Sequence, residues 1–172
     1  MTQNYFALFG LPERFDIDVT DLARRHRERI RVAHPDRFAQ GTALERQHAA
    51  ALSADLNDGL KTLRDVVSRA RHLLALRGVS TDEETDTAMD SDFLMTQMTW
   101  RERLEESAGN STDVEALQGE VSELRAEKER ALAQAFTQGG ADGLRHARTL
   151  VRELQFLERF ARELDDVLTE AC

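Results

Sequence analysis

Apolar residues at helical spacing run through most of this chain. From Val114 to Leu124 they recur three or four residues apart, and the same spacing is found from Leu150 to Leu168. Stripes of this kind are typical of amphipathic helices. The chain has only two prolines and nine glycines, which argues against many-turned β architectures. With no strand-like alternation of useful length anywhere, the predicted fold class is all-α.

Composition narrows the class of protein further. Of the 172 residues, 41% are hydrophobic and 32% charged, enough for a core beneath a charged surface. The one cysteine, Cys172, excludes an intrachain disulfide and a zinc cluster built from thiolates. No run approaches the ~18 apolar residues that a membrane span needs, and residues 1–6 lack the features of a signal peptide. We therefore expect a cytoplasmic protein with no membrane partner.

Charge is distributed unevenly along the chain. Residues 1–78 carry 13 basic and 10 acidic side chains, whereas residues 79–172 carry 10 and 22. The sharpest change is at residues 79–92, which hold six acids and no base. We interpret residues 79–90 as an acidic linker between a first domain, 1–78, and a second, 91–172. A net charge of −9 argues against general nucleic-acid binding, which needs clustered Lys and Arg.

The first domain reads as a helical hairpin after a short helical turn at residues 5–9. A helix is expected from about Thr20 to Ala33, capped by Asp18 or Thr20. A second begins near Leu44 and, alone or with a follow-on helix, reaches residue 76. The apolar face of the first helix carries Leu22, His26, Ile30 and Ala33; that of the second carries Ala51, Leu52, Leu56, Leu60 and Leu63.

The second domain reads as three helices, near residues 91–108, 112–137 and 141–171. The last two each carry one apolar stripe. A three-helix bundle is the economical way to bury these stripes together. The scattered histidines His48, His72 and His146 share no metal-ligand spacing, and no nucleophile–base pair or phosphate-binding loop is visible. We expect neither a cofactor nor an enzymatic activity.

The tripeptide His34-Pro35-Asp36 is the sharpest local signal. On its own it is a helix stop, because Pro35 lacks an N–H and disfavours the α region for His34. Here it lies at the turn of the hairpin, after a helix whose outer face is basic. That arrangement resembles a J-domain, the module that activates DnaK-type ATPase chaperones.

Further motifs make the resemblance more specific. Tyr5-Phe-x-Leu-Phe-Gly-Leu-Pro12, His34-Pro-Asp-Arg-Phe38, Leu56-Asn57, and Arg69-Ala70-x-x-Leu73-Leu74-x-Leu76-x-Gly78 are similar to the HscB family, the J-proteins of iron–sulfur cluster assembly. Phe93-Leu94-Met95-x-Gln97-Met98 and Leu154-Gln-Phe156-Leu157 continue the match toward the C-terminus. The resemblance covers nearly the whole chain and implies a J-domain joined to a C-terminal three-helix bundle.

The resemblance implies two partners for a co-chaperone. One is an HscA/DnaK-type ATPase chaperone, whose ATP hydrolysis it would stimulate; the other is an IscU-type scaffold protein that it would deliver for cluster transfer and maturation of iron–sulfur proteins. A general J-protein with a different client is the alternative, and a structural helical protein with a chance tripeptide is a second. The chaperone-binding residues would be Arg24, Arg27, Arg31, His34, Pro35, Asp36 and Arg37. Taken alone, the arginines would be read as a solvated helix face; their place next to the loop favours partner binding.

The implied scaffold-binding surface is an apolar patch after the linker. Without the resemblance, Leu94, Met95 and Met98 would be taken as bundle core. Phe156 lies off the main stripe of its helix, so it is a candidate for exposure, although Phe160 nearby could bury it in a wider core. The proposed scaffold-binding set is Leu94, Met95, Met98, Glu102, Glu106 and Phe156.

The chain departs from the family pattern at a few positions. His26 stands where several J-domains have an aromatic residue, Arg29 where they have an apolar one, and Thr99 where relatives carry another acid. Val66 replaces a frequent proline, so we expect a less sharply broken helix there. The zinc-binding cysteine pairs of some eukaryotic relatives are absent, which removes a metal site.

Overall fold

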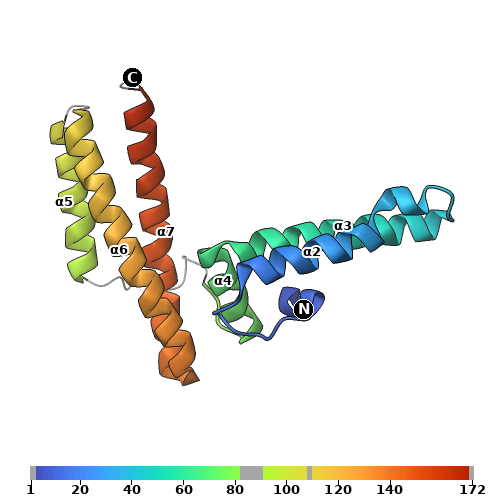
Figure 1. Ribbon diagram of the computed structural model, residues 1–172. Coiled ribbons are helices and arrows are strands. Elements are labelled where there is room, and N and C mark those ends of the chain that lie inside the picture. The colour runs from blue at the N-terminus through green and yellow to red at the C-terminus, as the bar shows by residue number, and fades with distance from the viewer. Residues whose placement is uncertain (1–2, 82–90, 108–109, 171–172) are drawn as a thin grey trace. The chain divides into compact units, whose positions relative to one another are not determined.

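The computed structural model describes residues 3–81, 91–107 and 110–170. Within these ranges the chain forms seven α-helices and one 3-10 turn, with no strand (Figure 1). It divides into two compact units, Met1–Val79 and Ser80–Cys172. The all-α prediction is therefore confirmed. Most of the predicted acidic linker, and also Cys172, lie outside the described residues.

The first unit is built on an antiparallel helical hairpin. Helix α2 (Val19–Ala33) and helix α3 (Ala43–Arg64) lie side by side, joined through the 3-10 turn η1 (Pro35–Phe38) (Figure 1). The short helix α1 (Tyr5–Phe9) packs against α3, and α4 (Val66–Leu76) follows α3. The core residues with almost no exposure are Phe6, Phe9, Leu22, Leu56, Leu63, Leu73 and Leu74.

Side-chain caps fix where the hairpin helices begin. The Asp18 carboxylate accepts the backbone N–H groups of Thr20 and Asp21 at 2.8 and 3.1 Å, so Asp18, not Thr20, is the N-cap of α2. At the start of α3, Thr42 and Glu45 form a reciprocal capping box. These bonds satisfy N–H groups that have no partner within the helix.

The long predicted helix after Leu44 is broken in two at Asp65. Its backbone is extended there (φ −79°, ψ 132°), and its carboxylate accepts the Ser68 N–H at 2.7 Å as the N-cap of α4. Arg69 then closes the corner, donating to the Leu63 carbonyl at 2.7 Å and lying 4.9 Å over the Phe15 ring. The expectation of a weaker break at Val66 is wrong, because an aspartate cap ends the helix without a proline.

The second unit consists of α5 (Ser91–Ser107), α6 (Ser111–Gln138) and α7 (Gly140–Glu170). The helices α6 and α7 form a long antiparallel hairpin (Figure 1). Gly139 and Gly140 make the turn with φ of 62° and 64°, a backbone region that other residues rarely adopt. A Cβ on Gly143 would lie 2.6 Å from the Ala135 carbonyl oxygen, so the two backbones meet there.

The predicted stripes supply the core of this second unit. Its fully or nearly fully buried side chains include Val114, Leu117, Val121, Leu132, Leu150, Leu154, Leu157, Phe160 and Leu164. None of the helices in the described part of the chain is long and apolar enough to cross a membrane.

Candidate functional site

Hydrogen bonds order the His34-Pro35-Asp36 segment and the end of α2 from which it begins. Helix α2 ends because His34 is extended (φ −61°, ψ 129°), which leaves the last carbonyls of α2 without helical donors. The buried Ser53 hydroxyl of α3 donates to the Ala33 carbonyl at 2.9 Å, and the Arg37 N–H donates to the His34 carbonyl at 3.0 Å. The end of α2, where the turn begins, is thereby attached to α3.

The His34 ring acts within the turn. Its Nδ1 accepts the Asp36 backbone N–H at 3.3 Å and lies 3.5 Å from the Asp36 carboxylate. The Asp36 side chain nevertheless remains 90% exposed. The turn therefore presents a carboxylate to solvent from a backbone that is already ordered, which suits a charge-assisted bond to an arginine of a partner.

The predicted basic stripe is exposed, but its members are not equivalent. Arg24 pairs with Asp21, and with Glu28 at 2.7 Å. Hydrogen bonds from Arg25 and Arg24 hold the pKa of Asp21 below its ordinary value. Among the described residues no salt bridge involves Arg27 or Arg31. The stripe charges that have no salt bridge therefore lie in the half of α2 that is nearer the loop.

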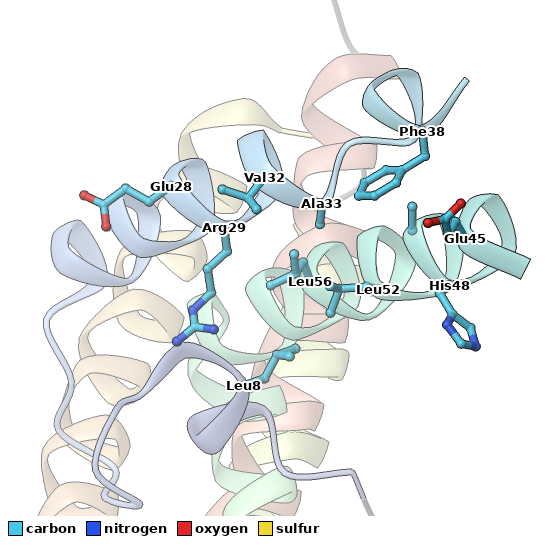
Figure 2. A pocket seen from close by; sticks show the side chains of 11 residues that line it. Leu8, Glu28, Arg29, Val32, Ala33, Phe38, Glu45, His48, Leu52 and Leu56 are labelled. Carbon is cyan, nitrogen blue, oxygen red and sulfur yellow. The ribbon is translucent and has the colours of Figure 1, made fainter. Parts of the chain in front are cut away.

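An apolar groove of about 690 Å³ opens between α2 and α3 near the same loop. In Figure 2, Phe38 of η1 and Leu8 of α1 reach it from opposite ends, and Leu52 and Leu56 of α3 lie between them. The stripe residues Arg24, Arg27 and Arg31 do not line it. The sequence pattern does not predict this groove: it places Leu52 on the packed face, whereas Leu52 and Val32 are both exposed.

The predicted patch on α5 is apolar and open. Leu94, Met95 and Met98 are 42%, 65% and 60% exposed, and Glu102 and Glu106 are exposed further along the helix. The alternative that the three apolar residues are bundle core is therefore wrong. Large exposed apolar side chains gathered on one helix are typical of protein-binding surfaces.

Phe156 does not share this exposure. It is 7% exposed, with its ring edge-on to Phe93 of α5 and stacked on Phe160 of α7, both at 5.7 Å. The expectation that Phe156 is exposed is wrong, because α5 brings Phe93 over it and widens the core beyond the main stripe of α7. Phe156 lies beneath α5, not beside the exposed patch on its surface.

The histidines and carboxylates outside these two sites do not form a metal site in the described ranges. In the described ranges no group of three or more His, Cys, Asp and Glu side chains could hold a metal ion. His72, one of the scattered histidines, is buried between Tyr5 and Phe6 and accepts the Tyr5 N–H at 3.2 Å. His26 bonds Asn57 across the hairpin at 3.0 Å, so it helps to hold α2 on α3.

Comparisons with known proteins agree with this arrangement. Residues 89–165 match the family model described as the HSCB C-terminal oligomerisation domain. A co-chaperone protein HscB homologue from Shewanella baltica is 41% identical over 167 residues, covering 95% of this chain and 96% of that protein. Its counterpart from Shewanella oneidensis is 40% identical over 164 residues, covering 94% of each.

Solved structures give the same answer. Chaperone HscB from Vibrio cholerae is 29% identical with a TM-score of 0.85, covering 99% of this chain and all of that one. Human co-chaperone protein HscB is 28% identical with a TM-score of 0.86, covering 95% and 81%. The chain has a J-domain hairpin joined to a three-helix bundle, and its relatives are co-chaperones. It is therefore a member of the class of J-domain co-chaperones. Within that class, the chain belongs to the HscB family.

Proposed function

We propose that this protein binds an IscU-type scaffold protein and delivers it to an HscA/DnaK-type ATPase chaperone, whose ATP hydrolysis it stimulates. The observation that carries the proposal is the open patch of Leu94, Met95 and Met98 on α5. The patch belongs to one unit, and the exposed Asp36 carboxylate belongs to the other. One chain thus offers two separate binding features, which supports a protein that brings two partners together and raises their effective concentration.

The chaperone side of the proposal is electrostatic. The set His34, Pro35, Asp36, Arg37, Arg24, Arg27 and Arg31 is assigned to the ATPase. Asp36 would pair with an arginine of the chaperone, while Arg27 and Arg31 would attract an acidic surface. The reaction itself takes place in the active site of the chaperone.

The scaffold side is apolar at its centre and acidic at its rim. Two flexible methionines and a leucine adapt well to a partner surface, and Glu102 and Glu106 would add polar contacts. Thr99 offers no charge where relatives carry an acid. Phe156 remains in the proposed set, but its burial makes its contribution indirect.

A capture experiment tests the proposal. The full chain is immobilised, and purified IscU-type and HscA-type proteins are added separately and together, with ATP hydrolysis followed in parallel. We expect both to bind, and hydrolysis to rise most when both are present. Chaperone stimulation without scaffold binding would favour a general J-protein with a different client. Loss of both activities would overturn the proposal.

A further inference from the structure

We propose that a row of aromatic rings beneath α5, together with Lys128, positions that helix for its partner, which makes Phe156 and Lys128 positioning residues for scaffold binding. The inference rests on the proposed function for the identity of the partner bound at Leu94, Met95 and Met98. It assigns to Phe156 a role other than direct contact, and to Lys128 a role in binding.

The aromatic row runs along the whole buried edge of α5. Phe93 lies edge-on to Phe156 at 5.7 Å, Phe156 stacks on Phe160 at 5.7 Å, and Trp100 stacks on Phe160 at 5.8 Å. Two rings of α5 are thus seated on two rings of α7. Contacts of this kind stabilise a structure beyond the area they bury, and their geometry fixes the angle of α5 as well as its distance from α7.

Lys128 joins all three helices at the first of these anchors. From α6, its Nζ lies 2.8 Å from Glu153 of α7 and 5.6 Å over the ring of Phe93 of α5. The Glu153 side chain is only 3% exposed, and a buried carboxylate requires an opposite charge. The ion pair with Glu153 therefore holds the Lys128 ammonium group in the position from which it covers the Phe93 ring.

The buried contact of α5 with the rest of the unit is narrow, and exposed polar contacts such as that of Arg101 with Glu163 of α7 at 3.9 Å add to it. Phe93 and Trp100 are the only buried residues of this helix, and a separation of seven residues, about two turns, places them on one edge. Near Trp100, the indole N–H donates a hydrogen bond to the Glu120 carboxylate at 3.1 Å, and Arg103 donates to the same carboxylate at 2.7 Å. The rotation of α5 about this single edge decides where the exposed patch points.

A helix with one narrow attachment is sensitive to the loss of any anchor. If α5 can rotate or detach, binding must first order it, and that ordering cost is subtracted from the affinity. Phe156 and Lys128 contribute by removing this cost before the scaffold protein arrives, without touching it.

The single tryptophan of the chain makes this testable. Two quantities are measured in the full-length protein: the affinity for the scaffold protein, and acrylamide quenching of Trp100 fluorescence. The test variants are Phe156→Leu and the double variant Lys128→Met with Glu153→Gln, which removes both charges. We expect a Kd about tenfold weaker, equivalent to ~1.4 kcal/mol, with increased Trp100 quenching and unchanged chaperone stimulation in the absence of scaffold protein. Lys128→Arg keeps the cation and should retain wild-type affinity.

Phe136→Leu is the matched control, since it makes the same substitution at a buried phenylalanine of α6, and it should leave both readouts near wild type. Weaker binding by Phe156→Leu with unchanged Trp100 quenching would mean direct contact and overturn the inference, as would normal affinity in both test variants. Should Phe156→Leu unfold, the comparison of Lys128→Arg with the double variant decides. Wild-type protein that fails to bind the scaffold protein would instead refute the proposed function.

Discussion

At the scale of single residues, the candidate loop combines a fixed backbone with a free charge. Asp36 is held through its backbone N–H by His34, while its carboxylate stays in solvent. Sequence alone identified the tripeptide. It did not show that the Ser53 hydroxyl anchors Ala33, because that bond joins residues twenty positions apart. The Asp36 side chain can therefore be changed without changing the shape of the loop.

Asp36→Asn tests the charge of this loop. We expect stimulation of chaperone ATPase activity to fall at least tenfold, because a neutral amide cannot replace a charge-assisted pair. Folding should be unchanged, since the side chain is largely exposed. Single-turnover ATP hydrolysis and thermal unfolding monitored by circular dichroism are the measurements. Wild-type stimulation by Asp36→Asn would contradict the assignment of the loop to the chaperone.

His72 gives the first unit a dependence on pH. Burial lowers the pKa of its imidazole below the ordinary value of 6.5, and its Nε2 accepts the Tyr5 N–H. The unfolded chain therefore binds the proton more readily than the folded one. The stabilising contribution of neutral His72 is complete above pH 6.5 and is lost as the pH falls toward the lower folded value.

We expect the urea midpoint of the protein to decrease as the pH falls below 6.5, the ordinary pKa of histidine. His72→Gln keeps a hydrogen-bond acceptor but does not titrate, so this decrease should be smaller in the variant. Equilibrium unfolding across the range from neutral to mildly acidic pH provides the measurement. An unchanged pH dependence in His72→Gln would show that other groups are responsible.

At the scale of helices, periodicity predicted most boundaries well. Helices α2, α6 and α7 lie within a few residues of their predicted ranges, because each carries a long apolar stripe. Periodicity is less informative where the position of one element depends on another. Phe156 was expected to be exposed, since its own helix does not show that α5 brings Phe93 over it. The α2–α3 groove was missed for a similar reason: it requires residues of four elements, α1, α2, η1 and α3, to come together.

The close approach of α6 and α7 at Gly143 can be tested against a second helical glycine. Gly143→Ala should destabilise the protein by about 1–3 kcal/mol, because its Cβ would meet a backbone oxygen that cannot easily move away. Gly119→Ala on α6, where nothing lies within 4 Å, should instead stabilise it by ~0.5–1 kcal/mol. Chemical denaturation of both variants measures the difference. Equal effects would contradict the close helix contact.

The exposed patch on α5 provides a separate prediction. Changing Leu94, Met95 and Met98 together to alanine should abolish scaffold binding yet leave unfolding cooperative, because these side chains are already largely in water. If all three side chains were buried, truncating each of them would cost several kcal/mol of stability. Calorimetric binding and thermal unfolding of the same sample measure both effects. Retained binding would place the scaffold site elsewhere.

At the scale of the whole molecule, the two units differ in the physical character of what they present. Residues 1–78 carry an excess of three positive charges, with Arg27 and Arg31 exposed on the half of α2 that is nearer the loop. The second unit is strongly acidic but presents an apolar patch at the centre of its proposed site. The proposed function would therefore combine a contact that depends on charge with one that depends on burial of apolar surface. Ionic strength should therefore distinguish them.

Salt should weaken chaperone stimulation much more than scaffold binding. Exposed charges are screened over roughly 8–10 Å near physiological ionic strength, whereas burial of apolar side chains persists in salt. In the full-length protein, we expect the concentration needed for half-maximal ATPase stimulation to rise severalfold between low and moderate salt, with little change in scaffold Kd. Arg27→Glu with Arg31→Glu should weaken stimulation and remove most of its salt dependence. Arg24 is left unchanged in this test because it is already paired within α2. Stimulation that salt does not alter would show that the basic stripe is only a solvated helix face.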